Sequence, residues 1–216
     1  MFNVCARCGI YSVEKTVDPG GPTAICPSCG YRQPFLRLPL YLLTGASGTG
    51  KSTICLHLAP ELPECVVLES DILWRPEFDQ PTTNWRDYHN LWLRLVKNIA
   101  QGGRPVVLCG TALPEQLEAC PERRYIGDID YLALVCDDDE LAERLRARPA
   151  WRSSDSSFIA HMVGFNRWLK ENAEQLRPGV TLFDTSDRTV AESVTWVKEW
   201  VRHRLGRGTE NGGVSY

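Results

Sequence analysis

Gly45-Ala46-Ser47-Gly48-Thr49-Gly50-Lys51-Ser52 has the pattern G-x-x-x-x-G-K-S and follows the apolar run Leu40-Tyr41-Leu42-Leu43. Such a loop binds phosphate because its glycines adopt positive φ, its backbone N–H groups turn inward, its lysine reaches the terminal phosphates and its hydroxyl reaches Mg²⁺. The residues that follow, Thr53-Ile54-Cys55-Leu56-His57-Leu58, have the composition of a helix. The order strand, glycine-rich turn, helix favours a phosphate-binding loop over a chance match in an ordinary turn.

Apolar runs alternate with helical patterns through the rest of the main segment. Five runs are apolar at successive positions, as expected of strands covered on both faces of a parallel sheet. They span residues 39–44, 65–69, 105–109, 131–136 and 180–184. Helices are predicted over residues 84–101, 138–147, 156–176 and 190–205. The sequence therefore predicts a three-layer α/β fold.

Length and charge limit the possible functions. A chain of 216 residues suits one medium α/β domain with a small appendage. The net charge of −3 gives no basic field, so charge balance does not support general nucleic-acid binding. No run approaches membrane-spanning length and no charged leader precedes an apolar core, so we expect a soluble, cytoplasmic protein without a membrane partner.

Nine cysteines divide into two groups. Two C-x-x-C pairs, Cys5/Cys8 and Cys26/Cys29, are separated by seventeen residues, a spacing suited to a four-cysteine zinc site, and they resemble the knuckles of zinc ribbons. Residues 1–37 are too few to fold by burial alone, and bound Zn²⁺ would supply the missing free energy. The remaining cysteines are expected to be small core residues in a reducing compartment. They are Cys55, Cys65, Cys109, Cys120 and Cys136.

These patterns divide the chain into a zinc ribbon over 1–37, a main domain over 38–205 and a glycine-rich, polar tail over 206–216 that is expected to be disordered. A structural role for the zinc is favoured over direct nucleic-acid binding, because the ribbon carries only a thin basic surface. The cations of that surface are Arg7, Lys15, Arg32 and Arg37.

Aromatic side chains are frequent after the second predicted strand. Trp85, Tyr88 and Trp92 share one stripe of the helix over 84–101 and are expected to face the core. Trp74 and Phe78 lie outside that stripe, in a predicted loop before Pro81, and are better candidates for touching a ligand.

Charged residues follow the ends of two further predicted strands. Asp71 follows the second strand, at the edge where ligands of open α/β sheets gather, although it could instead cap a helix. Glu69 would face the other side of the strand unless the chain turns there. Residues 137–140 are all acidic and are expected to cap the helix they begin rather than to bind metal. Four arginines around Pro149 exceed what the helix dipole requires, namely Arg144, Arg146, Arg148 and Arg152.

Residues 39–205 resemble the P-loop small-molecule kinases, which include nucleoside, nucleoside-monophosphate, shikimate and gluconate kinases. The resemblance rests on the glycine-rich loop, the acidic pair Glu69/Asp71, the arginine-bearing segment between the fourth and fifth strands, and the turn Asp184-Thr185-Ser186. It implies a five-stranded parallel sheet in the order 2-3-1-4-5. It also implies an enzyme that uses ATP and Mg²⁺.

The resemblance also assigns roles to individual residues. Lys51 would act on the β- and γ-phosphates, and Ser52 and Asp71 would bind Mg²⁺, with Asp71 orienting a metal-bound water or accepting the acceptor's proton. Arg144, Arg148 and Arg152 would stabilise charge in the transition state. ATP would be held by Gly45, Ala46, Ser47, Gly48, Thr49, Gly50, Lys51, Ser52 and Thr53.

One departure from related ATPases limits the function further. Cys109-Gly110-Thr111-Ala112 follows the third strand without the aspartate that many P-loop ATPases use for Mg²⁺, and no N/T-K-x-D guanine-reading motif is present. These absences argue against motor and switch NTPases.

We therefore expect a phosphotransferase that moves the γ-phosphoryl group of ATP to a small metabolite. A nucleoside or sugar-like hydroxyl is favoured as acceptor, because an acidic residue nearby would repel a phosphate. Three alternatives stay open: a nucleoside-monophosphate kinase, a zinc-ribbon protein that binds nucleic acid or a partner under nucleotide control, and a non-catalytic nucleotide-binding scaffold.

Overall fold

The computed structural model describes residues 2–149, 152 and 154–211, and it contains two sheets. The larger sheet is parallel and has the order β5-β6-β4-β7-β8. Counted within the main domain, this order is 2-3-1-4-5, as the family resemblance implied. The strands are β4 (Leu40–Gly45), β5 (Val66–Glu69), β6 (Val106–Cys109), β7 (Ile129–Val135) and β8 (Val180–Asp184).

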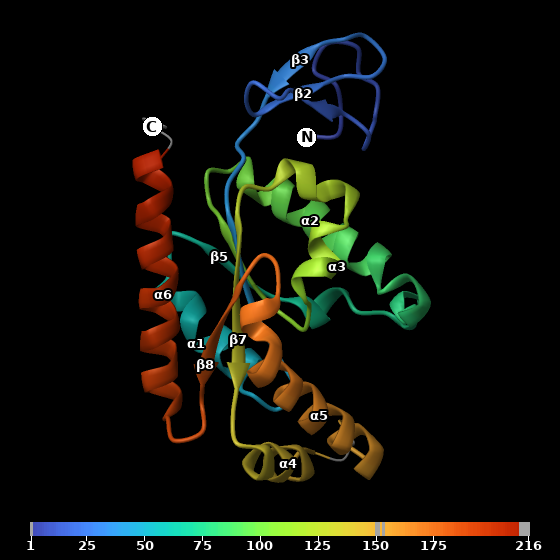
Figure 1. Cartoon of the computed structure of the whole chain (residues 1–216). Helices are drawn as coiled ribbons and strands as arrows, with labels where there is room; N and C mark the ends of the chain where they lie inside the picture. Colours follow the sequence, from blue (N-terminus) through green and yellow to red (C-terminus); the bar gives the residue numbers. More distant parts are fainter. Residues whose placement is uncertain (1, 150–151, 153, 212–216) are drawn as a thin grey trace.

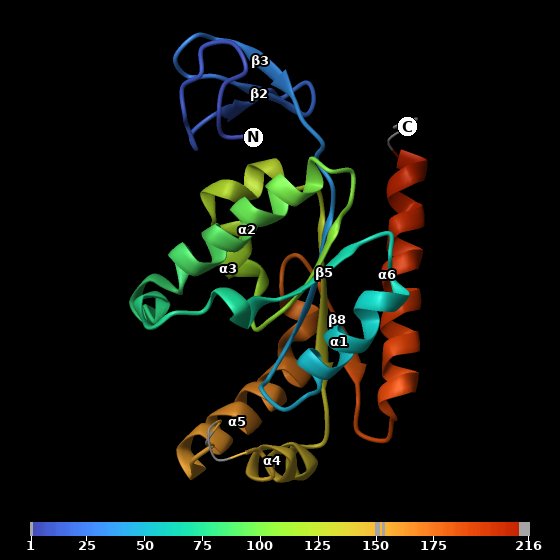
Figure 2. The ribbon, with the colours of Figure 1, turned by 180° about the vertical axis from the view of Figure 1, so that it is seen from behind.

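Helices cover both faces of this sheet, so the main domain has three layers (Figures 1 and 2). One face is covered by α1 (Lys51–Glu61) and α6 (Val190–Asn211). The other is covered by α2 (Arg86–Ala100), α3 (Pro114–Glu118) and α5 (Ser156–Asn172), and α4 (Asp138–Arg146) packs on α5.

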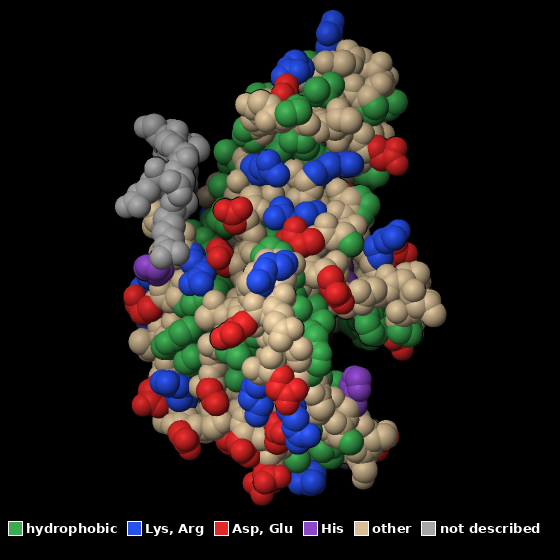
Figure 3. Space-filling view, in the orientation of Figure 1, with side chains coloured by type: hydrophobic (Ala, Val, Ile, Leu, Met, Phe, Trp, Pro, Cys, Tyr) green, Lys and Arg blue, Asp and Glu red, His purple; other side chains and the backbone are tan. Residues whose placement is uncertain are grey.

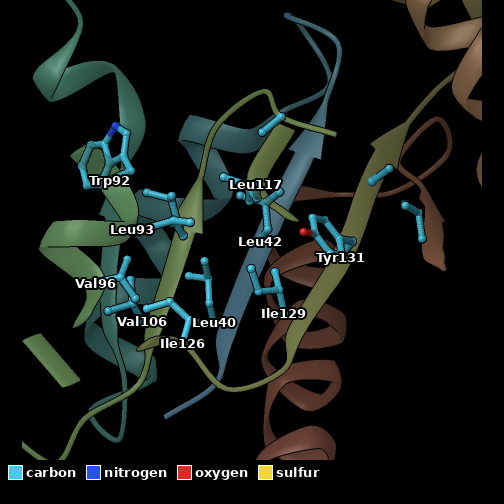
Figure 4. Packing of buried hydrophobic residues seen from close by; sticks show 14 of the residues in the cluster. Leu40, Leu42, Trp92, Leu93, Val96, Val106, Leu117, Ile126, Ile129 and Tyr131 are labelled. Carbon is cyan, nitrogen blue, oxygen red and sulfur yellow. The ribbon is translucent and has the colours of Figure 1, made fainter. Parts of the chain in front are cut away.

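Alternate residues of the central strand enter different halves of the core. Leu40 and Leu42 pack with Trp92 and other side chains on the α2 side, as Figure 4 shows. Tyr41 and Leu43 pack with α1 and α6 on the opposite side. All six residues of β4 are buried, which explains why the sequence is continuously apolar there.

The N-terminal segment, which the sequence predicts to be a zinc ribbon and which is called the ribbon below, forms the smaller sheet, which is antiparallel in the order β1-β2-β3. Its strands are β1 (Thr16–Val17), β2 (Thr23–Ile25) and β3 (Arg32–Pro34). The sheet lies over the end of the main domain that carries α2, beyond the N-terminal end of the central strand (Figure 1).

Aromatic packing and a buried charge join the two sheets. Phe2 and Phe35 of the ribbon pack edge-on against Tyr125, which ends the 3-10 helix η4 (Pro121–Tyr125). Lys97 of α2 is fully buried, donates to the Glu122 carboxylate at 2.5 Å, and lies 4.9 Å from the Phe2 ring centroid. The ribbon therefore packs directly on the kinase-like domain.

The last helix is longer than predicted. We expected it to end at residue 205, but α6 continues to Asn211, so the predicted disordered tail is wrong for residues 206–211. The two glycines of this stretch, Gly206 and Gly208, cost a helix only about 1 kcal/mol each, and no proline interrupts it. The rest of the predicted tail, 212–216, lies outside the described residues.

In the part of the chain that the structure describes, no helix is both long and apolar enough to cross a membrane.

Candidate active site

The glycine-rich loop connects β4 to α1, and two of its glycines are required by close approaches. Gly45 has φ of 133°, and a Cβ there would lie 2.3 Å from the Leu134 carbonyl oxygen. Gly48 has φ of 96°, and its Cβ would lie 2.7 Å from Leu141 Cδ1. A side chain at Gly45 would meet the β7 backbone and one at Gly48 would meet leucine side chains of α4, and both positive φ values favour glycine.

Lys51 begins α1 and folds back over the loop. Its Nζ donates to the carbonyl oxygens of Gly45 at 2.7 Å and Ala46 at 2.8 Å. Burial lowers the pKa of Lys51 to about 8, and the negative charge of Asp71 opposes that effect. A triphosphate entering the loop would supply oxygens in place of these two carbonyls.

Glu69 and Asp71 face the same space, because the chain turns directly after β5 into the 3-10 helix η1 (Ser70–Leu73). The Ser52 hydroxyl donates to the Glu69 carboxylate. A hydroxyl in contact with one carboxylate, with a second carboxylate on the same cavity lining, offers hard oxygen donors, which fits Mg²⁺. Strand alternation alone had left the role of Glu69 undecided, and the turn at Ser70 is what lets Asp71 face the same space as Glu69.

Three arginines reach the space from the opposite side: Arg144 lies near the end of α4, and Arg148 and Arg152 follow that helix. Burial lowers the pKa of Arg148, as does the positive charge of Arg152, while the charge of Asp71 raises it. These three groups are therefore close enough to act on one another. Arg144 is held differently: it donates to Glu140 at 2.6 Å and to the Thr185 carbonyl at 3.3 Å.

All of these groups line one cavity of about 910 Å³. Figure 3 shows a deep notch between the α2 side of the molecule and the end that carries α4 and α5. The volume suits a nucleotide together with a second small molecule. Gly45 and Ala46 lie beneath the lining, where their carbonyls accept from Lys51. The sequence-predicted residues on the cavity wall are Ser47, Gly48, Thr49, Gly50, Lys51, Ser52, Thr53, Asp71, Arg144, Arg148 and Arg152.

The aromatic residues are placed partly as expected. Trp74 lines the cavity and is 43% exposed, whereas Phe78 packs against the Tyr88 ring at 5.5 Å and against the core. Trp92 is buried, as predicted, but Trp85 and Tyr88 contact the core and also line the cavity. The expectation for Phe78 was therefore wrong, because the 3-10 turns before α2 direct its ring inward.

The four cysteines of the ribbon form a compact cluster whose sulfur atoms all lie within 4.8 Å of one another. Cys5 Sγ is 3.7 Å from Cys29 Sγ, and Cys8 Sγ is 3.8 Å from Cys26 Sγ. A tetrahedron with Zn–S bonds of about 2.3 Å has edges of about 3.8 Å, so the donor set fits Zn²⁺. The five other cysteines are buried in the main domain, as expected.

The fold and the loop are those found in P-loop kinases. A sugar kinase from Janibacter sp. HTCC2649 has a similar structure, with a TM-score of 0.53 and 16% identity over 77% of this chain and 94% of that one. The APS kinase CysC of Mycobacterium tuberculosis, solved with AMPPNP and APS, also gives a TM-score of 0.53 and 16% identity, over 77% of this chain and 98% of that one.

The family is shown by the sequence itself. The model of the AAA domain family matches residues 42–159, more than half of the 216 residues, so the chain belongs to that family. No curated protein sequence matches the chain significantly. By family the chain is an AAA-domain protein, and its fold is the one found in P-loop small-molecule kinases, which confirms the predicted fold class and agrees with the resemblance.

Proposed function

We propose that this protein transfers the γ-phosphoryl group of ATP to a hydroxyl group of a small metabolite, with a nucleoside or a sugar-like compound favoured. One observation carries the proposal: the loop, Asp71 and the pair Arg148/Arg152 line a single cavity. Phosphoryl transfer needs charge stabilisation and alignment more than covalent help from the protein.

The proposal gives a role to each polar group around the loop. Lys51 and the N–H groups at the start of α1 bind the β- and γ-phosphates. Ser52, Glu69 and Asp71 would hold Mg²⁺, which when bound neutralises phosphate charge. Arg148 and Arg152 approach from the other side, where they stabilise charge that develops on the transferred group.

The phosphoryl transfer needs only ATP, the acceptor and side chains that line the cavity. The acceptor oxygen forms a bond to the γ-phosphorus, and the bond from that phosphorus to the β–γ bridging oxygen breaks. ADP leaves with the bridging oxygen. The proton of the acceptor hydroxyl passes to the Asp71 carboxylate and then to water.

We also propose that Cys5, Cys8, Cys26 and Cys29 bind a structural Zn²⁺. The four sulfurs close the coordination sphere, which leaves no open position for catalysis. This ion would hold together a segment that has little core of its own.

The nucleic-acid alternative is weakened because three of the four ribbon cations on which it depends have partners within the protein. Of the four, only Arg7 is exposed without an ion pair or a side-chain hydrogen bond among the described residues. Lys15 is buried and donates to the Phe2 carbonyl at 2.7 Å. Arg32 pairs with Asp18, and Arg37 donates to the Ile126 carbonyl. Cations with such partners contribute little to phosphate binding on the ribbon surface.

The proposal is tested with the full-length protein, ATP·Mg²⁺ and a panel of nucleosides, nucleoside monophosphates and polyols, followed by ³¹P NMR. We expect ADP together with a new phosphomonoester, and neither product with Lys51→Met. A nucleoside diphosphate as product would instead indicate the monophosphate-kinase alternative. If no member of the panel accepts phosphate, the proposal fails.

A further inference from the structure

The cavity has a second wall whose charge is opposite to that of the loop and the arginines. We define the acceptor wall as the cavity-lining residues of segments 69–89 and 109–116. Among these described residues there is no lysine or arginine. The cations that line the cavity, Lys51 and the arginines, all come from α1, from the region of α4 and from the chain after β8.

Two carboxylates of the acceptor wall form no ion pair with any cation that the structure describes. Glu69 and Asp71 lie near Ser52 and Lys51, so bound metal and lysine would offset their charge. Asp79 and Glu115 are exposed and form no ion pair within the described residues. A carboxylate, sulfate or phosphate on the acceptor would meet like charge there.

His89 is a buried polar side chain of this wall whose hydrogen-bonding groups are unused within the described part of the chain. Only 4% of its surface is exposed, and it lines the cavity from the first turn of α2. Its imidazole makes no hydrogen bond to any residue that the structure describes. Burial lowers the pKa of His89 to about 4, so near neutral pH the ring is uncharged and offers one N–H donor and one nitrogen acceptor. A buried imidazole with both positions open suits a hydroxyl group.

Tyr88 and Trp74 give the wall a pair of packed aromatic rings. The Tyr88 hydroxyl donates to the Ser70 carbonyl at 2.7 Å, so this phenol is already committed. Trp74 packs edge-on against the Tyr88 ring, with 5.1 Å between ring centroids, and is itself 43% exposed. Exposed aromatic faces of this kind contact rings and attract positive charge.

The segment before α2 is held firmly against the rest of the wall. The Gln116 amide donates to the Asn84 side chain at 2.7 Å, and the Trp85 indole donates to Asp79 at 3.4 Å. Asn84 and Trp85 have φ of 54° and 52°, a conformation that side chains rarely adopt. These contacts place Trp85 at the cavity rather than in the core alone.

We propose that the acceptor wall selects a ring-bearing hydroxyl compound without negative charge, hydrogen-bonded to His89 and packed against Trp74 and Trp85. This inference rests on the proposed phosphotransferase function and names its acceptor class. It excludes acids, sulfates and phosphate esters as good acceptors, because Asp79 and Glu115 oppose them.

Matched pairs of probes test the inference. The full-length protein is saturated with Mg²⁺ and a non-hydrolysable ATP analogue, and calorimetry measures the binding of cytidine against CMP and of glucosamine against glucosamine 6-phosphate. We expect the probe without phosphate to bind at least about tenfold more tightly in one or both pairs, the size of a single like-charge contact. Equal or tighter binding of both phosphorylated probes overturns the inference, as does the absence of binding by all four.

Binding of the ATP analogue is measured first, so that the two proposals can fail separately. If the analogue does not bind, the proposed phosphotransferase function fails, and the inference with it. If the analogue binds and the probes behave otherwise than stated, only the acceptor class is wrong.

Variants of the wall give an independent readout. His89→Leu should raise the dissociation constant of the preferred probe about tenfold, and His89→Gln, whose amide retains a donor and an acceptor, should recover part of that loss. His57→Leu, on the exposed side of α1, is the matched control and should change nothing. Equal behaviour of the Leu and Gln variants at position 89 contradicts a hydrogen bond to the acceptor.

A charge variant remains informative if His89→Leu fails to fold. Asp79 and Glu115 are exposed, so Asp79→Asn with Glu115→Gln should preserve the fold. We expect discrimination against the phosphorylated probe to fall by about tenfold in this double variant. Unchanged discrimination shows that the two carboxylates do not select the acceptor.

Discussion

The Ser52 hydroxyl donates a hydrogen bond to the Glu69 carboxylate, which joins the first turn of α1 to the last residue of β5. In many P-loop ATPases the carboxylate for Mg²⁺ comes from the strand that here ends in Cys109-Gly110. A Cβ at Gly110 would lie 2.0 Å from Ser70 Oγ, so that turn has no room for a side chain. Glu69 instead supplies the carboxylate that contacts the Ser52 hydroxyl, and Asp71 lines the same cavity.

Glu69→Gln should weaken Mg²⁺ binding in the presence of ATP by about 10–100-fold, because residues that support a metal ligand contribute about this much. The amide keeps the size and one acceptor oxygen of the carboxylate but removes its charge. The measurement is a Mg²⁺ titration of nucleotide binding followed by fluorescence. Glu64→Gln is the matched control, since Glu64 pairs with Arg202 on the surface. Equal Mg²⁺ affinity in the two variants contradicts a role for Glu69.

Lys51 gives a prediction about pH. Its pKa is lowered to about 8 by burial, so the free protein loses this proton as pH rises through that value. A bound triphosphate favours the ammonium form and raises the pKa in the complex. Binding of ATP therefore takes up a proton above about pH 8, and the affinity falls as pH increases there.

Calorimetry in two buffers of different ionisation enthalpy measures this proton uptake directly. At about pH 8.5 the wild-type protein should take up a fraction of one proton per ATP, and any Lys51→Met protein that still binds nucleotide should take up less. Proton release on binding, or the same uptake in both proteins, would mean that another group titrates.

The main domain could be predicted well because its signals are local. Five apolar runs and a phosphate loop determine the layers, and the strand order came from the family resemblance rather than from periodicity. Glu69 could not be assigned a role, since the sequence does not show that the strand ends there. Only the turn at Ser70 places Glu69 and Asp71 on the same cavity. His89 gave no signal at all, because a lone histidine on a helix shows neither its burial nor its missing partner.

The contact between the ribbon and the main domain also could not be predicted from the sequence. Lys15 and Lys97 have the side chains of surface residues, yet both are buried where the ribbon meets α2. Their partners are distant in sequence: Lys97 pairs with Glu122, and the Tyr125 hydroxyl donates to the Lys15 carbonyl. Only the folded structure brings these groups together.

Glu122→Gln tests whether this contact stabilises the whole protein. Removal of one partner from a buried ion pair costs about 3–5 kcal/mol, because the other charge stays buried without compensation. Lys97 would then lie uncompensated beside the rings of Phe2 and Tyr125. We expect the free energy of unfolding in urea to fall by this amount, and by less than about 1 kcal/mol for the exposed pair partner Glu199→Gln. Equal losses would show that the buried pair adds nothing.

The cysteine cluster predicts one Zn²⁺ per chain, measured by elemental analysis of the purified protein. Cys8→Ser should lose the ion, since a hydroxyl is a poor replacement for a thiolate, while Cys120→Ser should retain it. We expect the zinc-free protein to show faster amide hydrogen exchange in residues 2–35. Full metal content in Cys8→Ser would contradict the site, and unchanged exchange after zinc loss would contradict its structural role.

Substitutions of Arg148 and Arg144 should differ in their effect on turnover, although both residues belong to the same arginine-rich stretch. Arg144 is bound to Glu140 and Thr185, so it positions the turn after β8, whereas Arg148 lies close to Arg152 and Asp71 in the cavity. Arg148→Gln should reduce kcat by about 10³-fold or more, as expected when an arginine that stabilises the transferred group is removed. Arg144→Gln should act mainly on the KM for ATP. The comparison uses steady-state kinetics with the best acceptor from the panel, and a larger loss of kcat in Arg144→Gln than in Arg148→Gln would reverse the assignment.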